Sequence, residues 1–199
     1  MNKIFERGLL GLLLAAVPGF AAASDDGAPA LYIEESRNVA QEFMQRLGGT
    51  LKSQLEATGA VGAIGVCKHV APALAAEYSK GDWVVRRVSL KTRNKALGEP
   101  DAWEREILRQ FDRRQAEAKP AAAPEASEVT EDADGRWFRY MKAIPVQPMC
   151  LQCHGKPEDI PVDVKPALEK EYPKDRATGY SAGDIRGAIA IKRKLQSDE

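Results

Sequence analysis

Residues 31–58 read LYIEESRNVAQEFMQRLGGTLKSQLEAT and contain the most regular pattern in the chain. Apolar residues recur there at every fourth position, at Val39, Phe43, Leu47, Leu51 and Leu55. This spacing places them along one face of an α-helix, so the stretch predicts a long N-terminal helix that packs one side against a core. The pair Gly48-Gly49 interrupts the stripe and predicts a kink.

Two further helices are predicted before residue 120. Residues 60–80 continue an apolar helical pattern, and a break is expected near Pro72 because proline lacks the amide that a helix needs. Asp101 and Glu104 have the spacing of a capping box, which predicts the start of a helix that extends to about residue 119.

Three segments rich in β-branched and aromatic residues predict strands at residues 83–90, 136–147 and 186–195. A short helix is expected over residues 164–171, between the last two of them. Because helices and strands do not alternate in a βαβ rhythm, the sequence predicts an α+β fold. We expect an antiparallel sheet with flanking helices, among them the long N-terminal helix.

The first residues have the composition of an export signal. Lys3 and Arg7 precede an apolar run over residues 9–17, and the small residues 21–23 provide a cleavage site. We expect residues 1–23 to be a signal peptide and residues 24–199 to form a single domain in the periplasm. No other stretch is long and apolar enough by sequence to predict a membrane span.

The charge pattern excludes some functions. The chain has 29 basic and 29 acidic residues, and its formal net charge is zero. No basic block or basic aromatic stripe is present in the sequence, so nucleic-acid binding is not expected. Residues 119–127, KPAAAPEAS, are of low complexity and predict a flexible Pro/Ala-rich loop.

The motif that points to a function is Cys150-Leu151-Gln152-Cys153-His154, the C-x-x-C-H attachment sequence of haem c. Two thiols with this spacing reach the two vinyl groups of the porphyrin and form thioethers. The histidine that follows is then held beneath the iron as the proximal ligand. Export supports this interpretation, because haem c is attached outside the bacterial cytoplasm. We therefore predict one covalently attached haem c, with iron as its metal.

Three other interpretations of the cysteines are weaker. A thioredoxin-type redox pair, or a plain disulfide between Cys150 and Cys153, gives no role to His154. A zinc site would need Cys67 and His69 in addition to the motif cysteines. Residues two positions apart on a helix point to nearly opposite sides, so those two side chains would not reach one metal ion.

The iron offers a second axial position, and five side chains have suitable chemistry: Cys67, His69, Met44, Met141 and Met149. Met149 adjoins the attachment site and cannot easily reach the opposite haem face, while Met44 and Met141 fit core positions. The residues alone leave three alternatives open, namely Cys67, His69 and no protein ligand.

Seven segments carry a resemblance to a known family: residues 65–68 (GVCK), 87–94 (RVSLKTRN), 100–104 (PDAWE), 150–155 (CLQCHG), 172–175 (YPKD), 177–180 (ATGY) and 183–187 (GDIRG). In this order they resemble the bacterial periplasmic c-type haem proteins with a PAS-like fold. The resemblance implies a PAS-like sheet with helices packed around it. It also implies His154 as the proximal iron ligand, Cys67 as the distal one, and thioethers at Cys150 and Cys153.

A thiolate ligand favours ferric iron, so the implied ligand pair predicts a low-potential haem. Reduction would weaken the bond from iron to Cys67 and open a site for a small gas. We therefore expect a redox or gas sensor that signals to a separate partner protein. A periplasmic low-potential electron carrier is the alternative, and a haem peroxidase is the least favoured, so the expected role is not enzymatic.

Five cations could pair with the haem propionates: Arg86, Arg87, Lys91, Arg93 and Arg186. Of these, Arg93 and Arg186 are the favoured candidates. Three tryptophans, Trp83, Trp103 and Trp137, are expected in the core rather than on an electron path.

Overall fold

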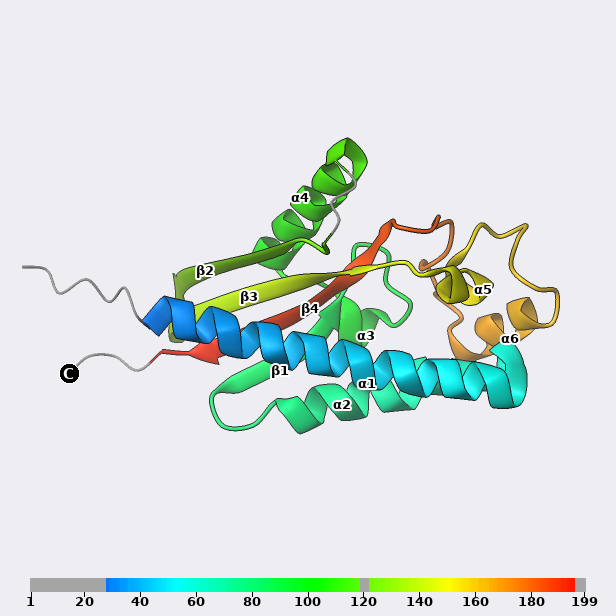
Figure 1. The fold of residues 1–199 in the computed structure, drawn as a ribbon, viewed down its shortest axis with the longest axis horizontal. Coiled ribbons are helices and arrows are strands. Elements are labelled where there is room, and N and C mark those ends of the chain that lie inside the picture. Colours follow the sequence, from blue (N-terminus) through cyan, green and yellow to red (C-terminus); the bar gives the residue numbers. More distant parts are fainter. Residues whose placement is uncertain (1–27, 119–121, 196–199) are drawn as a thin grey trace, which may run out of the picture.

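The computed structural model describes residues 28–118 and 122–195. The predicted signal peptide, residues 1–23, lies outside the described residues, as do residues 119–121 of the predicted loop. Four strands form one antiparallel sheet: β1 (Trp83–Val88), β2 (Glu125–Asp132), β3 (Gly135–Pro145) and β4 (Ile185–Lys194). Their order across the sheet is β1-β4-β3-β2 (Figure 1).

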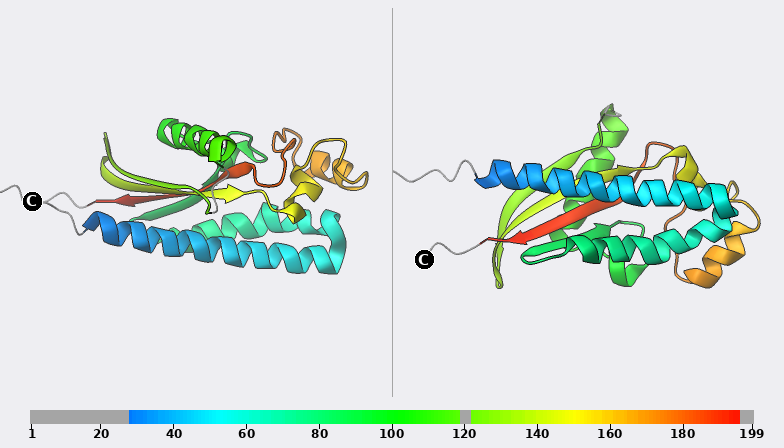
Figure 2. Two further views of the ribbon diagram at one scale, coloured as in Figure 1. Left: turned by 45° about the horizontal axis from the view of Figure 1, so that its top comes forward. Right: turned by 60° about the horizontal axis from the view of Figure 1, so that its bottom comes forward.

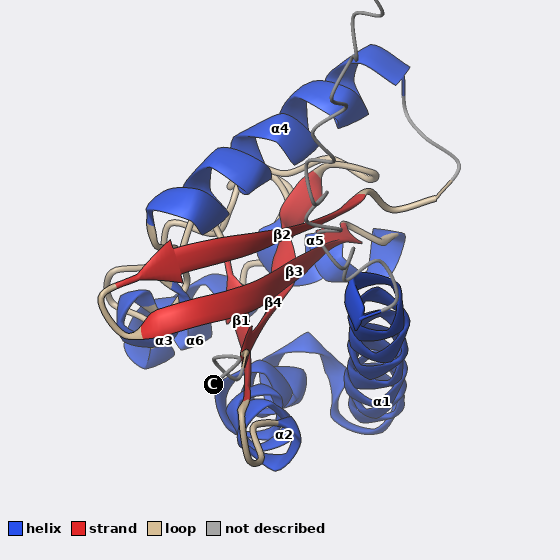
Figure 3. Ribbon diagram, turned by 90° about the vertical axis from the view of Figure 1, so that its left-hand side faces the viewer, coloured by secondary structure: helices blue, strands red, loops and turns tan. Residues whose placement is uncertain are grey.

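Helices cover both faces of this sheet. On one face lie α1 (Ala28–Gly65) and α2 (Ala71–Tyr78), and on the other lies α4 (Ala102–Ala118) (Figures 2 and 3). Three short helices, α3 (Lys95–Gly98), α5 (Leu151–His154) and α6 (Val164–Glu171), lie in the connections. The predicted α+β fold, with its long N-terminal helix and antiparallel sheet, is therefore confirmed.

The alternation of side chains along the strands builds a core on each face. Ile189 and Ile191 of β4 face α1 and α2, where they pack with Phe43 of the predicted stripe. Ala188 and Ala190 face α4 and pack in the cluster that contains Leu108 and Phe111. Small residues on β4 thus let α4 approach the sheet, while larger ones fill the space under α1 and α2.

The long helix differs from its prediction in the place of its break. Gly48 and Gly49 lie within α1, whereas Gly59 has non-helical dihedral angles, with φ 70° and ψ −175°. Gly59 can adopt the positive φ because it has no Cβ. The predicted kink at Gly48-Gly49 was therefore wrong, since glycine permits a break there and nothing requires one.

The predicted restart near Pro72 is confirmed. A π-helical turn, Val66–Val70, connects α1 to α2, and Pro72 lies in the first turn of α2. The amide of Ala71 donates to the carbonyl of Val66, five residues back, so the turn is wider than an α-helical one. The wide turn precedes a proline whose ring would clash with the carbonyl four residues before it.

The helix predicted from its capping box is confirmed in detail. The amide of Glu104 donates to Asp101 Oδ1 at 2.9 Å, and the amide of Asp101 donates to Glu104 Oε2 at 2.9 Å. These reciprocal bonds satisfy amides that a helix N-terminus leaves free. They fix the start of α4 at Ala102.

Strand β2 was not predicted, and its first residues, Glu125–Ser127, fall in the segment expected to be a flexible loop. That expectation was wrong for these residues, which pair with Tyr140–Lys142 of β3. β2 is an edge strand without buried residues, so its sequence lacks the alternation that identifies a strand with one buried face.

By length and composition alone, the helical run Ala30–Tyr78 could cross a membrane, with a mean hydropathy of 1.4 in its most apolar window. No such stretch was expected after the signal, because the sequence predicts two shorter helices, over residues 31–58 and 60–80. The run includes the break at Gly59, and Ala40, Phe43 and Leu74 pack it against the sheet. A helix that packs in a protein core can have the same length and apolar composition as a membrane span.

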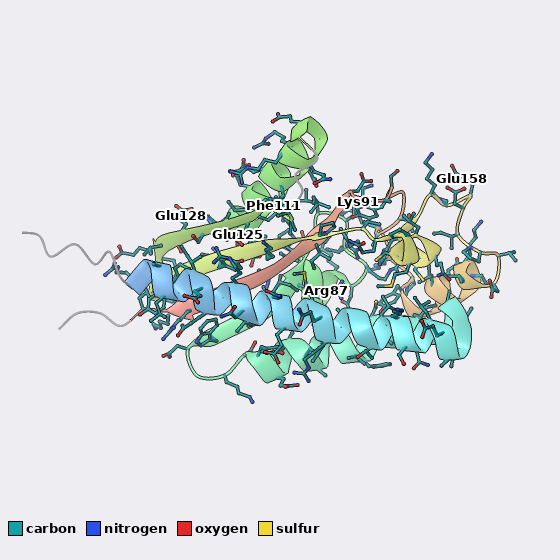
Figure 4. All side chains as sticks on the ribbon, in the orientation of Figure 1. Arg87, Lys91, Phe111, Glu125, Glu128 and Glu158 are labelled. Atoms are coloured by element: carbon teal, nitrogen blue, oxygen red, sulfur yellow. The ribbon has the colours of Figure 1, made fainter. Side chains whose placement is uncertain are left out.

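Glu125 joins α1 to the sheet and gives a test of this architecture. Its carboxylate accepts hydrogen bonds from Arg37 of α1 at 3.2 Å and from Tyr140 and Lys142 of β3 at 2.8 and 3.0 Å (Figure 4). The hydrogen bond from Arg37 is the main reason that the pKa of Glu125 falls to about 2.

The contribution of Glu125 is fully present above its ordinary pKa of 4.5 and is lost as the pH falls towards 2. We expect Glu125→Gln to lower the free energy of unfolding by about 2 kcal/mol at pH 7. In urea unfolding, the difference from wild type should shrink as the pH is lowered through this range. Glu131→Gln, an exposed change on the same strand, is the control. Equal effects of the two variants would contradict the proposed role.

Candidate functional site

A cleft of about 330 Å³ lies between α2, β1 and the segment after β1. Its apolar wall includes Ala71, Pro72 and Ala75 of α2 and Val88 of β1. Cys67, on the π-helical turn, and His154, at the end of α5, both line this cleft. The fold thus brings together two side chains that are 87 positions apart in sequence (154 minus 67).

The two motif thiols lie beside the cleft on consecutive short helical turns. Cys150 ends the 3₁₀ turn Pro148–Cys150, and Cys153 lies in α5. Both are half-buried and free, as is Cys67, so the described residues contain no disulfide. Burial raises the pKa of Cys150 and of Cys153 above the usual value of 9. The motif therefore presents two protonated, unbridged thiols at neutral pH.

The imidazole of His154 is buried and held by one backbone carbonyl. Nδ1 lies 2.6 Å from the carbonyl oxygen of Ala177, which can only accept a hydrogen bond. The ring must therefore carry its proton on Nδ1, and the lone pair of Nε2 is left for a metal. Two backbone hydrogen bonds, from Tyr180 to the carbonyl of His154 and from Gly179 to that of Gly155, fix the same segments to each other.

Arg186 lies against the same ring without occupying this lone pair. Its Nε is 3.2 Å from His154 Nδ1 and 3.5 Å from Nε2. Since Nδ1 already donates to Ala177, the shorter contact is not a hydrogen bond. Nearly equal distances also mean that Nε points along the lone pair of neither nitrogen. Burial, and then the charge of Arg186, hold the pKa of His154 well below 6.5, so the imidazole is neutral.

Arg93 and Asp175 hold the chain segments that carry the histidine and its carbonyl partner. Arg93 Nε donates to Asp175 Oδ2 at 2.9 Å, and its guanidinium also donates to the carbonyl of Cys153. Asp175 Oδ1 in turn accepts from the amide of Ala177 at 2.8 Å. The pair therefore connects α5 to the backbone that orients His154.

A β-bulge aims Arg186 at the site. Ile144 pairs with Gly187 and Pro145 with Ile185, so Arg186 has no partner in the register of β3 and β4. The next residue must be glycine, because a Cβ at Gly187, where φ is 156°, would lie 2.2 Å from the carbonyl oxygen of Val88. Strand pairing thus continues while the Arg186 side chain reaches Ser89 Oγ at 2.8 Å.

The structure separates the residues considered for the second axial position. Cys67 lines the cleft with His154, whereas His69 is exposed and is not among the lining residues. Met141 is fully buried in the sheet core. Met44 lies on α1 and packs against the core between this helix and the sheet. Met149 lies beside Cys150 in the 3₁₀ turn. Of these five side chains, Cys67 is the one that lines the cleft together with His154.

The structure also places the cations considered as propionate partners and the three tryptophans. Four arginines line the cleft: Arg86, Arg87, Arg93 and Arg186. Lys91 instead lies 4.8 Å from the ring centroid of Tyr180. Trp83 and Trp103 pack at the two core clusters, while Lys192 lies 3.8 Å from the ring centroid of Trp137.

A zinc site has no assembled ligand set in the described part of the chain. No group of three or more His, Cys, Asp or Glu side chains is placed there to hold a metal ion. His69 is exposed and lies outside the cleft that Cys67 lines.

Sequence reasoning missed the residues that position His154. Ala177 acts through its carbonyl, which carries no side-chain signal. Asp175 carries no signal of its own in the YPKD segment, because its role in holding Ala177 depends on a contact with Arg93, 82 positions away. Ser89 likewise lies in one of the resembling segments, and its hydroxyl accepts a hydrogen bond from Arg186, 97 positions away.

The comparisons with known proteins bear on the whole domain. Residues 25–193 match the family model described as "Tll0287-like: Tll0287". Among solved structures, the cyanobacterial heme-protein Tll0287 matches with a TM-score of 0.61 and 23% sequence identity. The match covers 84% of this chain and 98% of that one, and at this identity it shows a shared fold. No curated protein matches.

The pair Arg93–Asp175 gives a test of the site's architecture, since the side chains are only 8% and 12% exposed. Removing one partner of a buried ion pair leaves an uncompensated charge, so we expect Arg93→Ala to lower the free energy of unfolding by about 3 kcal/mol. Denaturant unfolding of Arg93→Ala, Asp175→Ala and the double variant measures this and the coupling between the two residues.

Arg176→Ala is the matched control, because Arg176 is the exposed neighbour of Asp175. Its effect should stay within about 0.5 kcal/mol. If Arg93→Ala cost no more than this control, the ion pair would not be what holds the segment.

Proposed function

The chain belongs to the Tll0287-like family, and we propose that it is an exported protein that carries one covalently attached haem c. The observation that carries the proposal is that Cys67 and His154 line one cleft, and that the two free thiols of the motif lie four positions and one position before His154. In this proposal Cys150 and Cys153 would form the thioethers, and the iron would be held by Nε2 of His154 and by the sulfur of Cys67.

The chemistry of the donor set fits a haem. His154 is neutral and offers the lone pair of a fixed nitrogen, which is the form of histidine that binds iron. The cleft combines an apolar wall with four guanidinium groups, and a haem combines an apolar macrocycle with two carboxylates. A thiolate at Cys67 would complete the axial pair.

When bound, the haem would supply one-electron chemistry between its ferric and ferrous states. Cys67, as a thiolate, would donate charge and hold the reduction potential low. Ala177 would keep the proton of His154 on Nδ1 and so maintain the basicity of the ligating nitrogen. Burial of His154 and the apolar side of the cleft would exclude water from this end of the site.

We propose a redox or gas sensor without enzymatic activity, acting in the periplasm through a separate partner protein. Cys67 lies on a π-helical turn, between the break at Gly59 and the proline at position 72. Such turns are frequent at functional sites, and this one gives Cys67 a segment whose helical geometry can change. Release of Cys67 on reduction would then both alter the turn and open a site for a small gas.

The ligand assignment is tested by spectra of the loaded protein and two variants. We expect the oxidised wild type to show a low-spin spectrum of thiolate type, which Cys67→Ala abolishes because the sulfur donor is removed. His69→Ala is the matched control, two positions away and outside the cleft, and should leave the spectrum unchanged. Loss of the spectrum in His69→Ala, with Cys67→Ala unaffected, would overturn the assignment.

The sensor role makes a separate prediction for the reduced protein. If Cys67 leaves the iron on reduction, the ferrous protein should bind carbon monoxide and change its spectrum on binding. A six-coordinate ferrous protein whose spectrum carbon monoxide leaves unchanged would instead identify an electron carrier.

Covalent attachment is tested by haem staining after denaturing electrophoresis of protein matured in the periplasm. We expect the wild type to retain haem and the double variant Cys150→Ser/Cys153→Ser to lose it, because thioethers require both sulfur atoms. The variant Cys67→Ala should still retain haem, since its sulfur forms no thioether. Retention of stain by the double variant would contradict attachment at the motif.

A further inference from the structure

The four arginines that line the cleft differ in whether they have an acidic partner. Arg86 pairs with Glu104 at 2.9 Å, and Arg93 pairs with Asp175 at 2.9 Å. Within the described residues, no ion pair is formed by the other two. The cleft therefore contains two guanidinium charges that are not matched by a carboxylate.

Arg186 is the more deeply placed of these two, with 9% of its surface exposed. Its donors reach only neutral acceptors, Ser89 Oγ at 2.8 Å and the carbonyl of Lys91 at 3.2 Å, besides the ring of His154. Burying a cation without an anion raises the free energy of the folded protein, so a negatively charged partner would stabilise Arg186.

Arg87 projects from β1 and is the second unmatched cation (Figure 4). Its Nε is buried and has no hydrogen-bond partner among the described residues. Arg87 and Arg186 line the same cleft, so two like charges that repel each other share one small volume. One or two anions between them would satisfy the free donor and remove the repulsion.

We infer that Arg87 and Arg186 receive the two propionate carboxylates of the haem. This inference rests on the proposed function, and it assigns the propionates to the arginines that lack an acidic partner. Arg93, favoured from the sequence, is excluded by its bond to Asp175, and Lys91 by its place outside the cleft. A guanidinium binds a carboxylate through two parallel hydrogen bonds, so each arginine can hold one propionate in a fixed orientation.

The assignment predicts an effect on the reduction potential. Removing either cation leaves a propionate charge uncompensated near the iron, which favours the ferric state. We expect Arg87→Gln and Arg186→Gln each to shift the reduction equilibrium of the loaded protein at least tenfold towards the ferric form. For a one-electron couple this is a lowering of about 59 mV. Arg87→Lys keeps the charge and should recover most of the shift.

Potentiometric titration of the purified loaded protein measures the shift, and resonance Raman spectra of the propionate bending modes report the hydrogen bonds directly. Arg109→Gln removes an equal charge from the exposed side of α4 and is the control, with less than a twofold shift expected. If Arg186→Gln does not fold or load, Arg87→Gln alone decides. Potentials and propionate modes equal to those of the control would overturn the inference.

The failure of this inference can be told apart from failure of the proposed function. A wild-type protein without covalent haem on a denaturing gel would refute the function itself, before any arginine is changed. A wild-type protein that carries haem, while the arginine variants resemble the control, would refute only the assignment of the propionates.

Discussion

The site depends on one hydrogen bond, from Nδ1 of His154 to the carbonyl oxygen of Ala177 at 2.6 Å. It fixes the tautomer of a buried imidazole, and so decides which nitrogen can bind a metal. The surrounding contacts hold the two partners of this hydrogen bond in place. Asp175 holds the amide of Ala177, Arg93 holds Asp175, and Arg93 also reaches the carbonyl of Cys153. The histidine and its partner are thus positioned by a connected network rather than by the motif alone.

The balance of charge in the cleft distinguishes the structural arginines from the unmatched ones. Arg86 and Arg93 are neutralised by carboxylates of this chain and act within its architecture. Arg186 is aimed by a bulge that requires glycine at position 187, and the strand pairing around it is otherwise continuous. Bulges are common next to functional sites, where they redirect a side chain, and here the redirected side chain is Arg186.

Much of this architecture could be predicted from local sequence signals. The stripe that includes Phe43 predicted α1, and the reciprocal bonds of Asp101 and Glu104 confirmed the start of α4. Strand β2 escaped prediction because an edge strand exposed on both faces has no apolar alternation. In the site, the sequence could single out only residues whose side chains carry chemistry, such as Cys67 and His154. The contact of Ala177 was beyond reach, because any residue has a carbonyl and only the fold decides which one meets His154.

X-ray absorption at the iron edge of the oxidised, loaded protein is the most direct test of the proposed iron ligands, His154 and Cys67. The account predicts one sulfur atom in the iron's coordination shell together with nitrogen atoms from the haem and from His154. A shell of nitrogen and oxygen atoms alone would contradict it, and would leave Cys67 as a cleft residue that does not bind the metal.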